Sequence, residues 1–207
     1  MTTTEKPVII GGGGHARSLV AMAPQAQKPD SYVDPAPGLP LKWLGNDDSF
    51  LADNNYADAP LIIGYVASED CSMATRRKII ERYAHRRFIT VVAPDAVVEP
   101  DTVIGAGSMI FHGAVVNTGS FLGDHVIVNT GAIVEHDVTV GDNTFIGPGA
   151  ILLGGVNVGK NVYIGAGVCI RNGVSICDDV TIAMASVVAK NIESPGFYAG
   201  NPARKLR

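Results

Sequence analysis

Residues 128–146, VNTGAIVEHDVTVGDNTFI, place an aliphatic residue at every sixth position. The spacing continues in both directions without an insertion or deletion, and all seventeen positions hold Val, Ile or Leu. They are Val92, Val98, Ile104, Ile110, Val116, Leu122, Val128, Val134, Val140, Ile146, Leu152, Val158, Ile164, Ile170, Ile176, Ile182 and Val188. A period of six does not return to one face of an α-helix, whereas short strands separated by regular corners repeat in this way. The pattern predicts a parallel β-helix from about residue 92 to residue 188 with no protruding loop.

The corners have their own signature. Three positions after each aliphatic position, fifteen of the seventeen residues are Gly, Asn or Asp. These residue types tolerate the left-handed backbone conformation that a tight corner requires. A corner is therefore predicted after every strand.

Composition excludes several classes of protein. Hydrophobic residues make up 46% of the 207 residues and charged residues 17%, which is typical of a globular chain. The net charge of −4 gives no basic footprint for nucleic acid, and no apolar run approaches the roughly 20 residues that span a bilayer. The N-terminus lacks the basic and apolar regions of a secretory signal, and the cysteines Cys71, Cys169 and Cys177 show no zinc spacing. We expect a cytoplasmic protein with reduced thiols that binds neither nucleic acid nor a membrane.

The first ninety residues follow different rules. Residues 6–23, KPVIIGGGGHARSLVAMA, read as a buried strand, a glycine loop and a helix that begins near His15. The loop satisfies G-x-G-x-x-A, and Asp34 lies twenty residues beyond Gly14, where it could reach a ribose hydroxyl. A further strand is expected in residues 59–65. Ninety residues hold three or four strands, too few for a complete dinucleotide fold, so a mononucleotide or nucleotide-sugar site is favoured. A tight turn without a ligand is the alternative.

A helix is predicted across residues 73–87. Its basic residues are spaced around the helix, which is typical of a solvated surface and not of an anion site. They are Arg76, Arg77, Lys78, Arg82, Arg86 and Arg87.

His136 and Asp137 are the candidate catalytic residues. Both fall at a corner. Aspartate recurs at the corner position that Asp137 occupies, whereas the position of His136 otherwise favours Pro, Gly, Ala, Thr or Asp. Gly154 lies eighteen residues later, and where three hexads make one coil it leaves space beside the imidazole. Histidine ionises near neutral pH, and an adjacent carboxylate can orient the ring and raise its basicity.

Other histidines compete for this role. His112 is the rival, but Gly113 and not an acid follows it, and His125 occupies a left-handed corner position. A metal hydratase with three histidine ligands is a poor fit, because these two and His136 fall at different corners and do not converge on one ion. No metal is expected.

Three motifs together resemble one family. The GGGGHA loop, a hexapeptide β-helix carrying NTGAIVEHD and the ending GNPARKLR are similar to the nucleotide-sugar acyltransferases. These comprise N-acetyltransferases of UDP-, dTDP- or GDP-linked 4-amino sugars, which act in lipopolysaccharide or O-antigen biosynthesis, and the related sialic acid O-acetyltransferases. The resemblance implies a small α/β Rossmann-like domain over residues 1–90 and a left-handed parallel β-helix over residues 91–207. It also implies three hexads per coil and a homotrimer with active sites in the clefts between subunits.

The resemblance further implies roles for individual residues. It makes His136 the base and Asp137 the partner that raises its basicity, with acetyl-CoA as co-substrate and direct transfer to the amine. Its nucleotide-sugar positions are Gly13, Gly14, His15, Asp34, Pro35 and Gly64. Its coenzyme A positions are Phe145, where many relatives have a second histidine, Gly154, Ala166 and Met184, with Arg204 and Lys205 near the phosphates. A sugar O-acetyltransferase and a non-catalytic scaffold that binds sugar nucleotides remain as alternatives.

Overall fold

A computed structural model describes residues 6–67 and 73–207 of the chain. Its N-terminal part is a four-stranded parallel sheet in the order β3-β2-β1-β4. The strands are β1 (Val8–Ile10), β2 (Ser31–Val33), β3 (Lys42–Trp43) and β4 (Leu61–Ile63). The helices are α1 (Gly14–Met22), α2 (Asp47–Leu51) and α3 (Ala74–Arg82), with 3-10 turns at Gln25–Gln27 and Asn54–Tyr56. None of the helices in the described part of the chain is long and apolar enough to cross a membrane.

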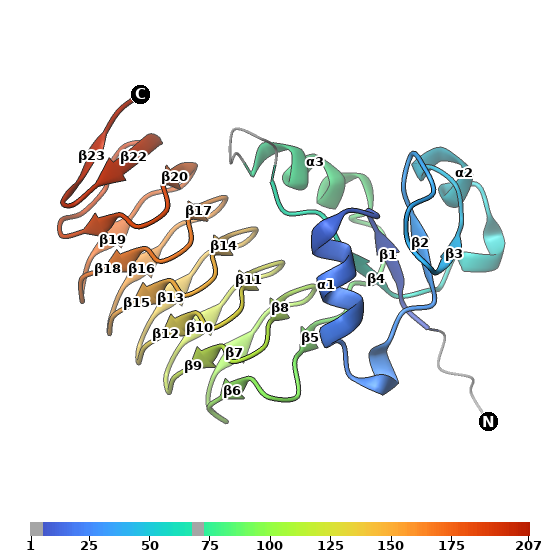
Figure 1. The fold of residues 1–207 in the computed structure, drawn as a ribbon, viewed down its shortest axis with the longest axis horizontal. Helices are drawn as coiled ribbons and strands as arrows, with labels where there is room; N and C mark the ends of the chain where they lie inside the picture. The colour runs from blue at the N-terminus through green and yellow to red at the C-terminus, as the bar shows by residue number, and fades with distance from the viewer. Residues whose placement is uncertain (1–5, 68–72) are drawn as a thin grey trace.

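The predicted β-helix follows. Its seventeen strands each end on one of the aliphatic positions that the sequence repeats. They are β5 (Val91–Val92), β6 (Val97–Val98), β7 (Val103–Ile104), β8 (Met109–Ile110), β9 (Val115–Val116), β10 (Phe121–Leu122), β11 (Ile127–Val128), β12 (Ile133–Val134), β13 (Thr139–Val140), β14 (Phe145–Ile146), β15 (Ile151–Leu152), β16 (Asn157–Val158), β17 (Tyr163–Ile164), β18 (Cys169–Ile170), β19 (Ser175–Ile176), β20 (Val180–Ile182) and β21 (Val187–Val188). Figure 1 shows them as a regular stack of coils beside the N-terminal sheet. The predicted fold class is confirmed.

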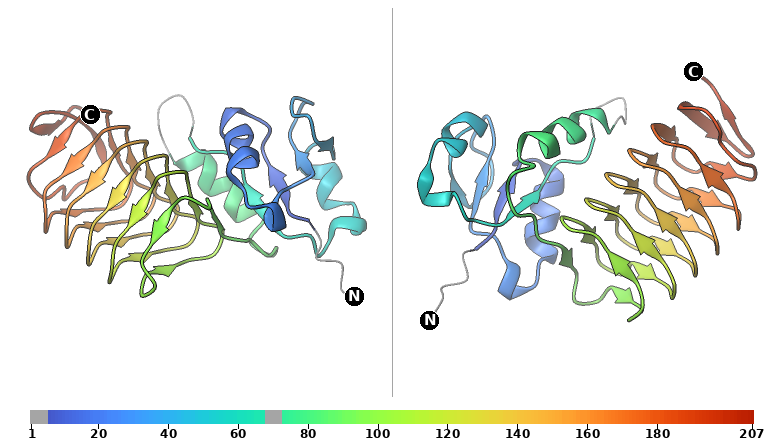
Figure 2. Two further views of the ribbon diagram at one scale, coloured as in Figure 1. Left: turned by 60° about the horizontal axis from the view of Figure 1, so that its bottom comes forward. Right: turned by 180° about the vertical axis from the view of Figure 1, so that it is seen from behind.

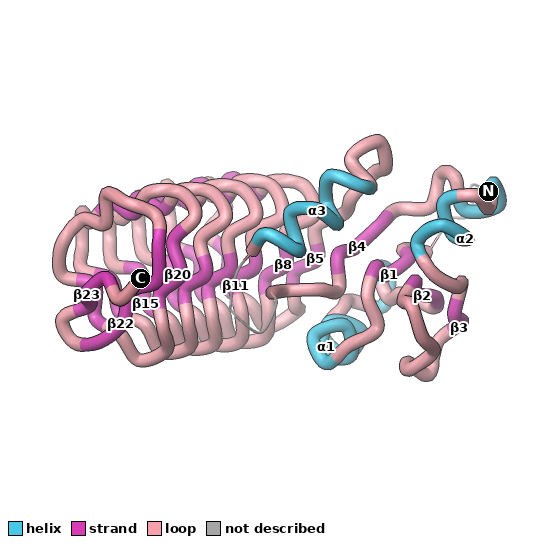
Figure 3. The backbone as a smooth tube through the Cα atoms, turned by 90° about the horizontal axis from the view of Figure 1, so that it is seen from above, coloured by secondary structure: helices cyan, strands magenta, loops and turns pink. Residues whose placement is uncertain are grey.

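Each strand pairs in parallel with the strand three places later, so that Ile133 lies opposite Ile151, one coil of eighteen residues away. This pairing makes three sheets. We call the sheet that contains β5, β8, β11, β14, β17 and β20 sheet 1. Sheet 2 consists of β6, β9, β12, β15, β18 and β21, and sheet 3 of β7, β10, β13, β16 and β19. The corner between sheets 1 and 2 is edge 1–2, and edges 2–3 and 3–1 are named in the same way. Figure 3 shows the coils from above.

The sequence explains the regularity of the coils. From Ile110 onward the aliphatic positions are buried, together with small residues four positions later such as Ala132 and Val138. Every corner position from Gly107 to Ala185 has a positive φ, as the Gly, Asn and Asp preference predicted. The hairpin β22 (Gly196–Gly200) and β23 (Ala203–Lys205) continues sheet 1 beyond β20 at the C-terminal end.

The outer faces of the three sheets differ. Residues of sheet 1 such as Met109 and Ile127 are fully buried, because they share a cluster with Leu19 and Met22 of α1. Figure 2 shows α1 between the N-terminal sheet and the coils in both views. The outward residues of sheet 2 are apolar and partly exposed: Val97, Val115, Ile133, Ile151, Cys169 and Val187. Those of the later coils of sheet 3 are polar and exposed: Thr139, Asn157 and Ser175.

The prediction of a solvated basic helix was wrong for Arg76, which is 0% exposed. Its Nε donates to the Tyr65 carbonyl (2.9 Å), and Nη1 donates to the His125 carbonyl (2.8 Å) and to Oδ1 of Asn143 (2.7 Å). Burial lowers the pKa of Arg76 to about 9, so the group remains charged at neutral pH. Arg76 therefore joins α3 to the β-helix. The helix is also shorter than predicted, ending at Arg82.

Candidate active site

His136 and Asp137 form a side-chain pair at edge 2–3, between β12 and β13. The left-handed backbone of Asp137 (φ 57°) turns the corner, and its Oδ2 lies 2.9 Å from Nδ1 of His136. The imidazole is 60% exposed. With Nδ1–H donating to the carboxylate, the neutral ring presents Nε2 as a free proton acceptor. The pair therefore has the arrangement that a general base requires.

Gly154 makes room for this ring. A Cβ added to Gly154 would collide with Nε2 of His136 and lie 2.6 Å from Cε1. The prediction that Gly154 leaves space for the imidazole is confirmed. It follows that any larger side chain at Gly154 displaces the candidate base before it affects a bound donor.

His112 also has a carboxylate partner, contrary to the expectation from its sequence neighbours. Its Nδ1 lies 2.5 Å from Oδ1 of Asp95, and the two side chains are 49% and 58% exposed. The hydrogen bond from His112 lowers the pKa of Asp95. Sequence reasoning missed the pair because it considered only adjacent residues. The signal was available, since position 95 lies one coil below Gly113.

His125 lies on the remaining edge, 3–1, and is nearly buried. Its ring meets the edge of Phe88 at 4.6 Å between centroids, and Nδ1 has no hydrogen-bond partner in the described structure. Burial, and then the charge of Arg76, lower the pKa of His125 to about 4. His112, His125 and His136 thus occupy three different edges and do not converge. Within residues 6–67 and 73–207 no group of three possible metal ligands is found.

The glycine loop lies between β1 and α1. Gly13 is the residue before the helix, no side chain caps it, and a Cβ added there would meet nothing within 4 Å. Asp34 follows β2 and has a structural role, because its carboxylate accepts hydrogen bonds from the backbone amides of Gly12 (2.7 Å) and Ala36 (3.1 Å). The Cβ position of Gly13 is therefore open at the N-terminus of α1, the end of a helix that favours an anionic group.

The other predicted nucleotide-sugar positions are less open. The ring of His15 packs on Phe111 at 5.1 Å, and its buried Nε2 has no partner among the described residues. Burial, and to a lesser extent Arg76, lower the pKa of His15 to about 4, so the ring is neutral near pH 7. Gly64 has a packing reason for being glycine, since a Cβ there would lie 2.5 Å from Cγ2 of Ile9. Pro35 is exposed beside Asp34.

The predicted coenzyme A positions do not meet within one chain. Phe145 is 5% exposed on sheet 1 and stacks on Tyr163 at 4.9 Å. Ala166 and the 75% exposed Met184 lie on edge 1–2, whereas Gly154 lies on edge 2–3 beside His136.

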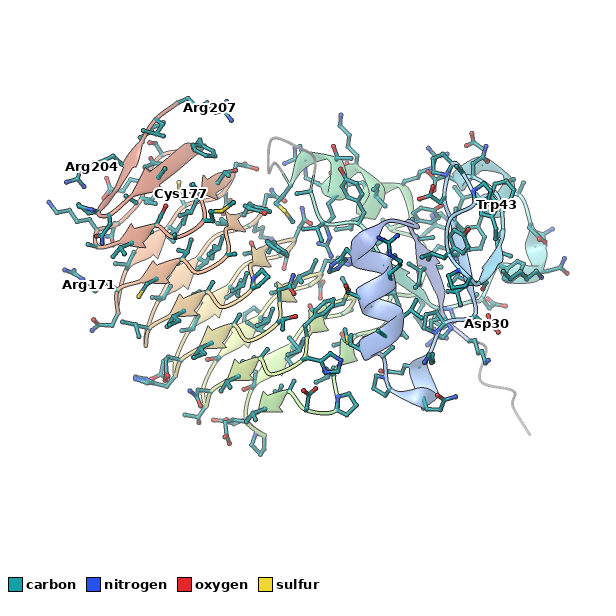
Figure 4. The ribbon with its side chains drawn as sticks, viewed as in Figure 1. Asp30, Trp43, Arg171, Cys177, Arg204 and Arg207 are labelled. Atoms are coloured by element: carbon teal, nitrogen blue, oxygen red, sulfur yellow. The ribbon has the colours of Figure 1, made fainter. Side chains whose placement is uncertain are left out.

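Basic side chains gather near the C-terminal end. Arg204 and Lys205 are exposed on β23, as a contact with phosphates requires. Figure 4 shows Arg171, which sequence analysis did not single out, projecting from the same margin as Arg204. Arg171 follows β18 and leads into edge 2–3, the edge that carries His136.

Comparisons with known proteins agree with this architecture. The family model "Bacterial transferase hexapeptide (six repeats)" matches residues 119–154, and "Hexapeptide repeat of succinyl-transferase" matches residues 137–172 and 158–190. No curated protein sequence matches the chain significantly.

Solved structures match almost the whole chain. The acetyltransferase domain of PglB from Neisseria gonorrhoeae FA1090 is 30% identical, with a TM-score of 0.88 and coverage of 98% of this chain and 100% of that one. PerB from Caulobacter crescentus, in complex with CoA and GDP-perosamine, is 28% identical with a TM-score of 0.88, covering 98% and 97%. WeeI from Acinetobacter baumannii AYE, at 19% identity and a TM-score of 0.85 with 98% and 100% coverage, supports the fold alone.

Proposed function

The chain belongs to the hexapeptide-repeat acetyltransferases, and from this premise we propose that it transfers the acetyl group of acetyl-CoA to the amine of a nucleotide-linked 4-amino-deoxy sugar. The observation that carries the proposal is the His136–Asp137 pair, in which Nδ1 faces the carboxylate and Nε2 lies beside Gly154. Two relatives support the substrates. The Neisseria domain has been solved with acetyl coenzyme A, and the Caulobacter enzyme with CoA and GDP-perosamine.

The reaction is a direct transfer. The sugar amine attacks the thioester carbonyl, Nε2 of His136 takes a proton from the nitrogen, and Asp137 holds the ring through Nδ1–H. As the C–S bond breaks, the coenzyme A sulfur leaves and recovers the proton from the imidazolium. The neighbours of His136 are Glu135 and Asp137, so no adjacent serine or cysteine offers a covalent route.

The nucleotide end of the acceptor binds at the glycine loop. A side chain added at Gly13, beside the start of α1, would meet nothing within 4 Å, and the first turn carries no acidic residue that would repel a diphosphate. Asp34 holds the loop in shape, and each of its carboxylate oxygens, which accepts from one amide, can accept a further hydrogen bond from a ribose hydroxyl. Phosphates of the donor lie towards Arg171 and Arg204, at the opposite end of the β-helix.

The active enzyme is a homotrimer. The apolar outer row of sheet 2, in which Val97 is 51% exposed, is an extended hydrophobic surface of the kind that marks an interface. Sheet 2 is bounded by edges 1–2 and 2–3. If three subunits turn sheet 2 towards a common axis, edge 2–3 of each subunit meets edge 1–2 of the next. This arrangement brings His136 and Gly154 together with Ala166 and Met184 of the neighbouring subunit, which explains why one chain holds only parts of the site.

The test is turnover of UDP-, dTDP- and GDP-4-amino sugars with acetyl-CoA, followed by release of free thiol. We expect activity with at least one amino sugar, and a loss of roughly 10²–10⁴-fold in His136→Ala. His85→Ala, which changes an exposed histidine of the N-terminal part that follows α3, should behave as the wild type. Near-normal turnover by His136→Ala would refute the assignment of the base. Acetylation of the hydroxy sugar instead would indicate an O-acetyltransferase, and nucleotide-sugar binding without any turnover would indicate a scaffold.

A further inference from the structure

A second histidine–carboxylate pair, His112 with Asp95, is exposed on edge 1–2 and has no part in the mechanism above. Asp95 engages Nδ1, and no hydrogen-bond partner for Nε2 is found among the described residues. A neutral imidazole held in this way presents Nε2 as an acceptor for a hydroxyl group. We propose that His112 binds a hydroxyl of the acceptor sugar and Asp95 fixes its ring, at an active site completed by the neighbouring subunit's His136.

The glycine loop lies close to this pair in the same chain. The ring of His15, which follows the loop, packs at 5.1 Å on Phe111, and His112 is the next residue after Phe111. A nucleotide bound at the start of α1 therefore has its sugar end beside edge 1–2. His112 and its partner Asp95 are exposed polar side chains at that edge.

The height of His112 along the β-helix places it on the acceptor side. Adjacent strands are about 4.8 Å apart, so each coil of eighteen residues rises by that amount. On this scale His112 lies about 6 Å before His136, measured towards the N-terminal part, whereas Ala166 and Met184 lie about 8 and 13 Å beyond it. In the trimer proposed above, the donor occupies the side beyond His136, and the acceptor must approach past His112. The inference rests on that proposed trimer and acceptor.

The first experiment measures KM for both substrates in His112→Ala and Asp95→Asn, using an amino sugar that the wild type accepts. Losing one hydrogen bond should raise the acceptor KM about 10-fold in His112→Ala, with less effect in Asp95→Asn. The KM for acetyl-CoA and the trimer should be unchanged. The matched control is Lys160→Ala, which removes an exposed pair with Asp142 (2.7 Å) on edge 3–1, away from sheet 2. An unchanged acceptor KM in an intact His112→Ala trimer would overturn the inference, as would a loss confined to kcat.

The second experiment tests the contribution across subunits. Co-expressed His136→Ala and His112→Ala chains, purified through two different tags, form mixed trimers. Some interfaces then pair a native His112 with a native His136 from the other chain, and these should restore a component with the wild-type acceptor KM. No such component appears if both residues of one chain serve the same site. A wild-type enzyme that is monomeric and active would refute the trimer itself, whereas an active trimer indifferent to His112 would refute only this inference.

Discussion

Substituting alanine for Gly154 should inactivate the enzyme while leaving the fold intact. The added methyl group would overlap Nε2 of His136 and approach Cε1 to 2.6 Å. Because the imidazole is 60% exposed, it can rotate into solvent instead of straining the coil. The rotation breaks the hydrogen bond to Asp137 and removes Nε2 from the place where it meets the amine.

The effects on stability and on catalysis should differ widely. An exposed hydrogen bond of this kind contributes about 1 kcal/mol, and replacing glycine by alanine offsets part of that loss by restricting the unfolded chain. The backbone accepts the change, since Ala106 and Ala166 occupy the equivalent corner position in other coils. Loss of a positioned base costs roughly 10²–10⁴-fold in turnover, or about 3–5 kcal/mol in the barrier. We therefore expect Gly154→Ala to unfold near the wild-type denaturant concentration and to show the kcat of His136→Ala.

The assay is steady-state thiol release together with urea unfolding of Gly154→Ala, His136→Ala and the double variant. If both changes act through the same imidazole, the double variant should be no slower than His136→Ala alone. A Gly154→Ala enzyme with normal kcat and a raised acetyl-CoA KM would refute the reasoning. That result would make Gly154 a donor contact and not the support of the base.

Three further predictions concern the N-terminal part and its junction with the β-helix. Arg76→Met should lower the free energy of unfolding by about 3–5 kcal/mol, because two buried acceptors and one part-buried acceptor lose their donor. Arg77→Met, a change at its exposed neighbour, should alter the free energy of unfolding by less than about 0.5 kcal/mol, and equal effects in urea unfolding would contradict the buried bridge. The pKa of His125 is about 4 in the folded protein against 6.5 ordinarily, so the unfolded chain binds more protons between these values and stability should fall as the pH drops below about 6.5. His125 should contribute about 2 kcal/mol of the loss at pH 5, and His15, whose pKa is lowered to the same value, a similar amount. His125→Asn, which keeps a residue suited to positive φ, should remove the His125 part of this loss in urea unfolding at pH 7 and 5, and an undiminished loss would contradict that contribution. A Cβ at Gly13 meets nothing within 4 Å, and Gly13→Val should weaken nucleotide-sugar binding about 10-fold or more by blocking the start of α1, with unchanged acetyl-CoA affinity in calorimetry. Asp34→Ala should weaken nucleotide-sugar binding too, and unchanged affinity in both variants would remove the loop from the site.

The sequence predicted the β-helix almost completely, because each coil contacts only its neighbours and the pattern of one hexad determines its local structure. The pairing of His136 with Asp137 and the space that Gly154 leaves could be predicted for the same reason. Both depend only on the residues of one corner and on the residue one coil away. Of the N-terminal strands, β1 and β4 were recognisable from their apolar runs and the glycine loop.

The failures arose where distant segments meet. Arg76 was misread because its charge suggested solvent, although it shares one helical stripe with Ile79, Ile80 and Tyr83, at spacings of three, four and seven. That spacing was the available signal. Its acceptors come from residues 49 and 67 positions away, which no local pattern identifies. The His112 pair was missed for a related reason, because its acid lies in the preceding coil.

The uninterrupted register of the β-helix also restricts how its length can change. Removing six residues between His136 and Ala166 would leave the aliphatic core in phase, and the chain would still coil. Every later position would move round by one edge, however, and Ala166 and Met184 would leave edge 1–2. Only a change of eighteen residues keeps each later side chain on its own edge, and it shifts the donor positions relative to His136 by about 4.8 Å, the rise of one coil. The core thus tolerates steps of six residues, whereas a site divided between two edges tolerates only steps of eighteen.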